Sequence, residues 1–309
     1  MPKNITLIMP SRLGHTIFCT PTIAMIRKVL PNVSMHVIAV KSISQSILEN
    51  NPHIDILCLM ESDDALRLSQ LEDQLLINFN EAAEAKEFVD SFSCEKMKYF
   101  VDYDTASHLA DRLLNYVAER FRYTPVKEDH KYHIFPKPEH NKISIEGSVP
   151  IVGLHMGCHG LAKKRFRLFN KFSHERAWPI QKYISLAEKM VPSCRFLLTG
   201  TKEEKQLGDL FVKEIPDTIN TIDCLKPLEL AALLPECQLF ISNDSGVQHL
   251  ACAMGVKTLG LFGVSHPIDT GPYPLGADHL YIHRDPISQI SVEEVYDVAM
   301  KEIGTCAVK

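Results

Sequence analysis

The sequence predicts an α/β protein of two domains, each with parallel strands joined by helices. Short apolar runs alternate with amphipathic segments along most of the 309 residues, and this alternation is typical of βαβ units. The length is sufficient for two such domains with cores of their own. The alternation is interrupted over residues 124–149, which hold three prolines, a glycine and mixed charges. We therefore expect a first domain at 1–149, ending in a linker at about 124–149, and a second domain at 150–309.

The first domain should begin with a buried strand at Asn4–Met9, followed by a polar turn and an apolar helix. Two starts fit that helix, one at Thr20–Pro21 and one earlier, near His15. Gly14 permits a close turn at the carboxyl end of the strand, where open α/β sheets place their chemistry. The dinucleotide fingerprint G-x-G-x-x-G is absent. The elements expected next are strands at Ser34–Val40, Ile54–Met60, Leu75–Phe79 and Lys98–Asp102, and helices at Ser42–Glu49, Asp63–Gln70, Glu81–Val89 and Ser107–Arg122.

The second domain should start with a strand at Pro150–His155, and a basic segment follows it. Residues 161–182 carry seven Lys and Arg against the single acid Glu175, with phenylalanines between them. A solvated positive loop would explain this composition, and so would adhesion to the anionic inner face of a membrane. The elements expected next are helices at Trp178–Val191, Lys202–Lys213, Pro227–Leu234 and Val292–Ile303, and strands at Arg195–Thr199 and Ile219–Ile222.

The most informative stretch is Leu239–Pro267, LFISNDSGVQHLACAMGVKTLGLFGVSHP. It predicts a buried strand at Leu239–Ser242, a polar elbow, a helix at Val247–Met254 and a second apolar strand at Lys257–Phe262. The first amides of a helix lack partners within the helix, and the helix dipole adds partial positive charge there. A strand, a tight turn and a helix start therefore make an anion site.

The elbow residues suit such a site. Ser245 is a good N-cap, Gly246 lets a ligand approach the backbone, and His249 projects from the first turn. Asp244 fits beside an anion only if it accepts hydrogen bonds from the ligand or from the loop. An ordinary β–α–β unit that is capped by Asp-Ser-Gly explains the spacing equally well.

The stretch NDSGVQHLACAMGVKTLGLFG resembles the signature of glycosyltransferase family 9, the bacterial heptosyltransferases. In that signature, Asp-Ser/Thr-Gly-x-x-His-Leu-x-x-Ala precedes an apolar strand and Phe-Gly. The resemblance implies a GT-B fold, with two Rossmann-like doubly wound domains facing a cleft and a last helix that often packs back on the first domain. It also implies an inverting, metal-independent enzyme that moves heptose from ADP-heptose to a glycan of the lipopolysaccharide core type. The nucleotide sugar is a substrate, and no cofactor is implied.

The resemblance also implies residues that bind the donor. Arg176 stands two residues before Trp178, near the position of a family Lys that contacts the donor phosphates, and Lys163 and Lys164 are rival candidates. Arginine is a competent phosphate ligand. Glu229 would bind the ribose, although an acid in the first turn of a helix also fits simple dipole compensation. The full donor set that we predict is Gly157, Arg176, Gly200, Glu229, Asp244, Ser245, Gly246 and His249.

The candidate catalytic residue is His15. The opening of the chain resembles the family's Arg-Leu-Gly-Asp segment, with His15 in place of the Asp that acts as base. A histidine can take the proton of an attacking hydroxyl near neutral pH. Two alternatives stay open: the base is lost, or another group such as Asp102 or Asp104 serves.

Composition narrows the classes of partner and compartment. A net charge of −5 gives no reason to expect nucleic acid, and no apolar run approaches the roughly 20 residues that cross a bilayer. The N-terminus lacks the apolar region of a signal peptide, and nine cysteines without a CxxC pair read as reduced core residues. We expect a cytoplasmic protein, with peripheral contact at the inner membrane as an option. His155, Cys158 and His159 form a weak metal pattern that loop polarity explains better.

The acceptor is the least defined partner. The first-domain stretch Asn78–Asp104 is rich in Glu and Asp, and an acidic face would repel a polyanionic glycolipid. The sequence therefore favours a less anionic glycan or glycolipid. Two rival functions keep the fold: an inactive nucleotide-sugar-binding protein and a nucleotide-sugar epimerase.

Overall fold

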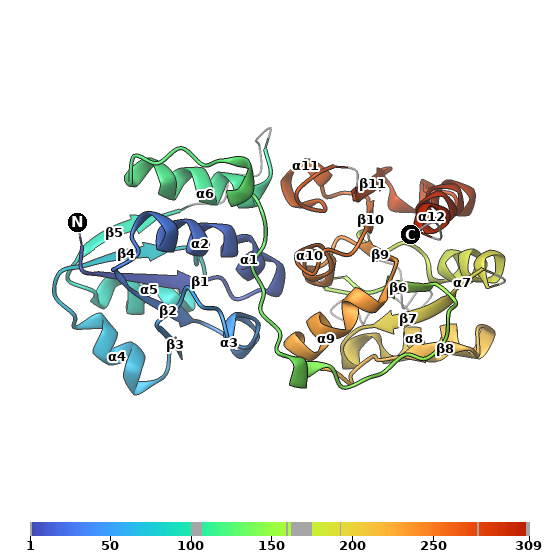
Figure 1. Ribbon diagram of the computed structural model, residues 1–309, viewed down its shortest axis with the longest axis horizontal. Helices are drawn as coiled ribbons and strands as arrows, with labels where there is room; N and C mark the ends of the chain where they lie inside the picture. Colours follow the sequence, from blue (N-terminus) through green and yellow to red (C-terminus); the bar gives the residue numbers. More distant parts are fainter. Residues whose placement is uncertain are drawn as a thin grey trace. The chain divides into compact units, whose positions relative to one another are not determined.

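The computed structural model describes residues 2–99, 107–158, 160–161, 175–191, 193–276 and 278–306. The chain divides into two compact units, residues 1–137 and 138–309. Each unit contains one parallel sheet with helices on both faces (Figure 1). The prediction of two α/β domains with parallel strands is therefore confirmed. The division falls inside the stretch 124–149, whose regular elements are the short 3-10 helices η1 (Lys127–Asp129) and η2 (Pro138–His140).

The first unit is a five-stranded sheet with the order β3-β2-β1-β4-β5. Helices α2 and α6 cover one face, and α4 and α5 cover the other (Figure 1). The central strands β1 and β4 are almost wholly buried because they are covered on both sides. The strands are β1 (Asn4–Met9), β2 (Ser34–Ala39), β3 (Ile56–Leu59), β4 (Gln74–Asn78) and β5 (Glu95–Lys98), and the helices are α1 (Leu13–Phe18), α2 (Thr20–Val29), α3 (Ser42–Leu48), α4 (Asp63–Ser69), α5 (Ala83–Ser91) and α6 (Leu109–Arg120).

The helix that follows β1 explains why the sequence offered two starts. It is interrupted at Cys19, so that α1 begins at Leu13 and α2 begins at Thr20, with Pro21 in its first turn. Proline is tolerated there because the first amides of a helix have no partner within the helix. His15 consequently lies on the short helix α1, immediately beyond the carboxyl end of β1.

The second unit is a six-stranded sheet with the order β11-β10-β9-β6-β7-β8. Helices α9 and α10 lie on one face, and α7, α8 and α12 lie on the other (Figure 1). The last helix packs against α7 and β9, and its Val295, Ala299 and Ile303 join the core of this unit. The strands are β6 (Ile151–His155), β7 (Arg195–Thr199), β8 (Thr218–Asn220), β9 (Leu239–Asn243), β10 (Thr258–Phe262) and β11 (His279–His283), and the helices are α7 (Ile180–Met190), η4 (Lys202–Glu204), α8 (Lys205–Glu214), α9 (Pro227–Leu233), η5 (Leu234–Glu236), α10 (Gly246–Ala253), α11 (Pro267–Thr270), η6 (Ile287–Gln289) and α12 (Val292–Cys306).

Two of the four edge strands, β5 and β11, depart from the sequence prediction. For the strand expected at Lys98–Asp102, the structure has β5 at Glu95–Lys98, and residues 100–102 lie outside the described part of the chain. The β5 sequence EKMK gives almost no apolar signal, since an edge strand has only one neighbour and its side chains stay partly exposed. The edge strand β11 was missed altogether, because His279–His283 (HLYIH) has only three consecutive apolar residues between two histidines and lies in a polar context.

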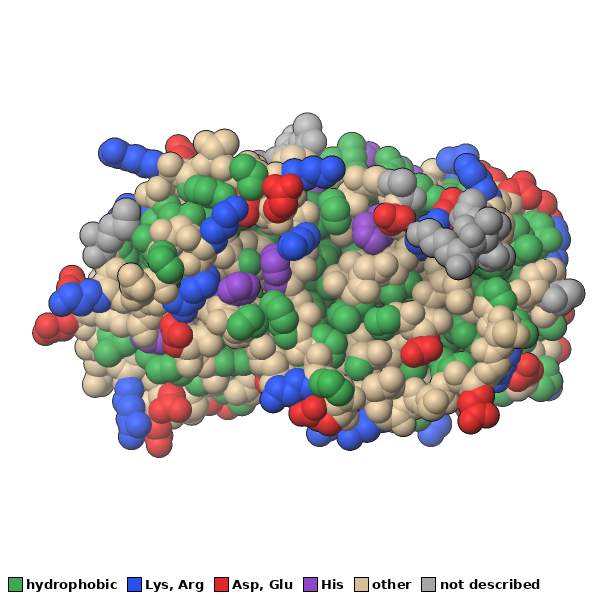
Figure 2. All heavy atoms as spheres, viewed as in Figure 1, with side chains coloured by type: hydrophobic (Ala, Val, Ile, Leu, Met, Phe, Trp, Pro, Cys, Tyr) green, Lys and Arg blue, Asp and Glu red, His purple; other side chains and the backbone are tan. Residues whose placement is uncertain are grey.

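The charge pattern of the surface is mixed. On the face shown in Figure 2, acidic and basic side chains lie among one another over both units. This mixture agrees with the small net charge of −5. Among the helices that the structure describes, none is long and apolar enough to cross a bilayer.

Candidate functional site

The two sheets share a feature that marks where ligands bind. In each unit the first strand lies beside the fourth, β1 beside β4 and β6 beside β9, and the chain winds in opposite directions from that point. The loops that follow two such strands diverge, and open α/β sheets bind ligands in the resulting crevice. The candidate sites are therefore the loops after β6 and β9 in the second unit and the loops after β1 and β4 in the first.

In the second unit, β9 leads directly into the predicted elbow. Ser245 has an extended backbone with φ −153°, and its hydroxyl accepts a hydrogen bond from the amide of Gln248 at 3.4 Å. The hydroxyl of Ser242 lies 3.0 Å from the same oxygen. The capping predicted for Ser245 is confirmed, and the helix begins at Gly246. The first-turn amides of α10 thus lie at the point where the strand order reverses, in the arrangement that binds anions.

Arg176 is brought to this elbow. Its Nη1 lies 3.6 Å from Oδ2 of Asp244, with the carboxylate side chain 10% exposed and the arginine side chain 37% exposed. Burial raises the pKa of Asp244, and the nearby positive charge of Arg176 opposes that shift. Asp244 therefore holds a cation close to the start of α10.

Gly157 and Gly200 meet around a buried acid. A Cβ on Gly157 would lie 2.6 Å from Cγ of Glu204, and one on Gly200 would lie 3.0 Å from its Cβ. The carboxylate of Glu204 accepts hydrogen bonds from the amide and the hydroxyl of Thr201, both at 2.7 Å. Close packing against Glu204 therefore requires both glycines, whether or not a ligand approaches them.

Glu229 has a contact that stabilises its own helix, and His249 is buried. Oε2 of Glu229 accepts a hydrogen bond from the amide of Lys226 at 2.9 Å, which is a capping-box contact, and the acid also lies in the first turn of α9, where it compensates the helix dipole. His249 belongs to the second-unit helix α10 and is only 2% exposed. Sequence reasoning offered both as ligands of the donor, and that role stays a prediction.

Several predicted residues lie outside the described part of the chain. The phosphate candidates Lys163 and Lys164, the alternative bases Asp102 and Asp104, and His159 of the weak metal pattern are among them. Within the residues that are described, no group of three or more His, Cys, Asp or Glu side chains is arranged to hold a metal ion.

In the first unit, the crevice between β1 and β4 is a cavity of about 330 Å³. His15 lines it together with one cation, Arg12, one acid, Glu81, and the side chains of Asn80 and Tyr99. Leucines of α6 supply part of the wall. The ring of His15 is half-buried and meets Phe18 edge to face, at 5.6 Å between centroids.

Buried polar side chains hold the loop that carries His15. The hydroxyl of Thr16 donates to the carbonyl of Arg12 at 2.9 Å, and that of Ser44 donates to the carbonyl of Pro10 at 2.6 Å. Asn80 donates from Nδ2 to the carbonyl of Met9 at 2.9 Å. Hydrogen bonds therefore hold the loop after β1 to α3 and to the segment after β4, and they fix the start of α1.

The described acids of Asn78–Asp104 do not form one face at this cavity. Glu95 receives two hydrogen bonds from Arg120, at 3.1 and 2.8 Å, and Asp90 lies 3.6 Å from Nζ of Lys98. Among the described acids of the stretch, Glu81 alone lines the cavity. The expected repulsion of an anionic acceptor is therefore weaker than the composition suggests.

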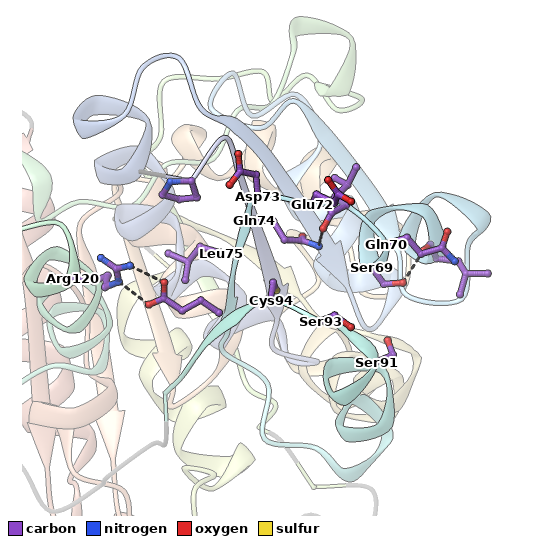
Figure 3. Close-up of a pocket in the computed structure, with 14 residues that line it drawn as sticks. Ser69, Gln70, Glu72, Asp73, Gln74, Leu75, Ser91, Ser93, Cys94 and Arg120 are labelled. Atoms are coloured by element: carbon purple, nitrogen blue, oxygen red, sulfur yellow. Dashed lines mark hydrogen bonds and ion pairs between the residues drawn. The ribbon is translucent and has the colours of Figure 1, made fainter.

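A larger cavity, of about 730 Å³, lies at the amino ends of the strands of the first sheet, opposite the carboxyl ends where His15 lies (Figure 3). Residues that precede β4 and β5 line it, including Asp73 and Cys94. Its arginine, Arg120, is already engaged by Glu95, as the dashed lines show. Open α/β sheets bind ligands at the carboxyl ends of their strands, so we assign the site to the smaller cavity beside His15.

One residue with an evident role was missed by sequence reasoning. Asn243, the last residue of β9, is fully buried and hydrogen-bonds the loop after β6 and the segment after Arg176. The available signal was an amide side chain at the end of an otherwise apolar strand, since a buried amide needs partners.

Comparison with known proteins agrees with these features. A model of glycosyltransferase family 9 (heptosyltransferase) matches residues 163–297. Lipooligosaccharide heptosyltransferase 2 of Haemophilus influenzae is 25% identical over 132 residues, and lipopolysaccharide heptosyltransferase 2 of Escherichia coli is 25% identical over 142 residues. The alignments cover 41% and 43% of this chain and 35% and 36% of the relatives, so the chain spans about a third of their length.

Solved structures extend the likeness to the whole fold. A family 9 glycosyl transferase from Veillonella parvula has a TM-score of 0.81 at 18% identity, covering 98% of this chain and 97% of the other. The ADP-heptose lps heptosyltransferase II of E. coli has a TM-score of 0.77 at 14% identity, covering 99% and 100%. The predicted GT-B class is confirmed. The resemblance to glycosyltransferase family 9, the heptosyltransferases, is likewise confirmed, and residues 163–297 carry it.

Proposed function

We propose that the protein is an inverting glycosyltransferase that moves heptose from ADP-heptose to a hydroxyl of a glycan acceptor of the lipopolysaccharide core type. The observation that carries this proposal is the elbow at Asp244–Gly246, where a helix start and Arg176 converge in the family 9 segment. Heptosyl transfer is what the names of the relatives describe, and the E. coli structure is named for ADP-heptose.

The diphosphate of the donor would bind at the elbow. The first-turn amides of α10 and the guanidinium of Arg176 would supply hydrogen bonds and positive charge there. As the bond between the anomeric carbon and the phosphate oxygen breaks, negative charge builds up on the departing ADP. Groups that are already oriented toward that charge stabilise the transition state more than the ground state.

The acceptor would bind in the cavity beside His15. The ring takes the proton of the attacking hydroxyl, the oxygen forms a new bond to the anomeric carbon, and the configuration inverts. The cavity of about 330 Å³ presents an aromatic ring, an amide and one charge of each sign, which suits a sugar ring. We infer an acceptor sugar without a cluster of phosphates at this position, because Arg12 is the one cation that lines the cavity among the described residues.

Incubation of the purified protein with ADP-heptose and a heptose-lacking core oligosaccharide tests the function directly. The expected products are ADP and the heptosylated glycan, detected by mass spectrometry. Donor that binds without turnover would favour the inactive binding protein, which the missing family Asp keeps open. Isomerised donor without any acceptor would point to the epimerase.

We expect Arg176→Ala to weaken donor binding by roughly 10- to 100-fold, because a hydrogen bond to a charged group contributes about 1.5–3 kcal/mol. The loss of the cation also leaves the buried Asp244 facing the phosphates. Titration calorimetry with ADP at two salt concentrations measures the affinity, and the remaining binding should depend less on salt.

Arg195→Ala is the matched control, because that arginine is also ion-paired, 3.1 Å from Asp217, at the remote amino end of β7. It should leave ADP affinity unchanged. If Arg176→Ala instead lowers only the binding to anionic vesicles, the basic segment is a lipid-facing patch and its role in donor binding is wrong.

A further inference from the structure

The side chain of Asn243 joins three segments of the donor site. Its Nδ2 donates to the carbonyls of Met156, at 2.8 Å, and Gly157, at 3.3 Å. Its Oδ1 accepts from the amide of Trp178 and the hydroxyl of Tyr183, both at 3.0 Å. A primary amide can make four hydrogen bonds, and all four are used in a side chain that is 0% exposed. The loop after β6, the start of α10 and the segment that carries Arg176 are thus tied at one point.

A second contact holds the same segment from the other side. A Cβ on Gly263 would lie 2.5 Å from the carbonyl oxygen of Glu175 and 2.8 Å from Cβ of Ile287. The backbone immediately before Arg176 therefore fits against the loop after β10 with no room for a side chain. Trp178, two residues after Arg176, is 2% exposed and donates from Nε1 to the carbonyl of Ile290 at 3.0 Å.

These contacts bracket Arg176 on both sides. The residue before it rests on Gly263, the second residue after it is bound by Asn243, and its own guanidinium lies 3.6 Å from Asp244. Ordering a free arginine side chain and a flexible loop backbone on binding costs conformational entropy, which weakens the affinity. A segment that is ordered before the ligand arrives does not lose this entropy on binding.

We propose that Asn243 and Gly263 are positioning residues that hold Arg176 ready for the diphosphate of a nucleotide sugar. The proposal rests on the proposed function, since it assumes that a diphosphate binds at the elbow. Asn243 and Gly263 act through Arg176 and do not touch the donor themselves. Their replacement should therefore weaken donor binding only as long as Arg176 is present.

A double-mutant cycle tests this dependence, with ADP as the probe in titration calorimetry. Asn243→Ala and Gly263→Ala should each weaken ADP binding roughly 10-fold in the wild-type background. In the Arg176→Ala background, each should change the affinity by less than about 2-fold. Gly263→Ala keeps the test decisive if Asn243→Ala does not fold, because it displaces the segment without touching the asparagine amide.

Gln238→Ala provides the matched control. Its Oε1 accepts the amide of Ile151 at 2.5 Å, so it ties the same two strands, β6 and β9, at their amino ends. This variant should lower the melting temperature and leave ADP affinity unchanged. Equal losses in the presence and absence of Arg176 would overturn the positioning role while leaving the proposed function intact. A folded wild type that does not bind ADP would remove the proposed function and this inference together.

Discussion

Replacement of His15 by alanine should leave ADP binding intact and reduce heptosyl transfer by roughly 10²–10⁴-fold. A sugar hydroxyl is a poor nucleophile at neutral pH, and loss of its proton acceptor costs a factor of this size. The ring of His15 lines the first-unit cavity, while the elbow that we assign to the donor belongs to the second unit. Donor affinity and transfer should therefore separate in this variant.

His15→Asp, which restores the residue of the family pattern, should recover part of the activity. Its pH–rate profile should extend to lower pH, because a carboxylate stays deprotonated at lower pH than an imidazole does. His53→Ala is a suitable control, since that half-buried histidine also belongs to the first unit but contacts His133 and Phe135 instead of the cavity. Steady-state rates at saturating donor, measured as a function of pH, give both results.

Two other outcomes carry distinct meanings. Full activity in His15→Ala would show that another group takes the proton, and Asp102 and Asp104 would be tested next. An inactive wild type that gains activity in His15→Asp would mark an enzyme that has lost its base. Either result would contradict histidine as the working base.

The inner strands of both sheets could be predicted because burial on two faces leaves continuous apolar runs. Runs such as those of β1 and β9 are visible without any knowledge of their neighbours. The edge strands β5 and β11 could not be predicted in the same way. Their pairing comes from a single neighbouring strand, and a sequence window does not contain that neighbour.

The candidate donor site was partly predictable because some of its features are local. A helix start and its Ser245 cap involve a few consecutive residues, so a candidate anion site could be proposed from the sequence. The ion pair between Arg176 and Asp244 and the four hydrogen bonds of Asn243 join segments that are 60 or more residues apart. Such contacts depend on the strand order of the sheet, which the sequence pattern left open.

For some residues the sequence suggested a role in ligand binding, whereas the structure shows a contact within the protein. Glu229 was a candidate for the ribose, yet its carboxylate caps its own helix. Gly157 and Gly200 were candidates for ligand approach, yet both make room for Glu204. A residue type can satisfy a structural and a functional need equally, so only contacts in the folded chain separate the two.

The second large effect is expected for Gly246→Val, which should weaken ADP binding on the order of 100-fold. Gly246 is the first residue of α10, which follows β9 at the point where the strand order reverses beside β6. A branched side chain there keeps the phosphate away from the first-turn amides of the helix. Each hydrogen bond to the charged phosphate is worth about 1.5–3 kcal/mol, so the loss of one or two accounts for the expected factor.

The backbone conformation at Gly246 permits this substitution. The residue is helical and is not one of the glycines with a positive φ, so any L-amino acid can adopt its conformation. Gly255 at the other end of the same helix is the opposite case, because its φ is +71° although a Cβ there would meet nothing within 4 Å. Gly255→Ala should therefore lower the free energy of unfolding by about 1 kcal/mol and leave ADP affinity unchanged. Urea unfolding and calorimetry on the two variants measure both quantities, and unaltered ADP binding in a folded Gly246→Val protein would remove the diphosphate from the start of α10.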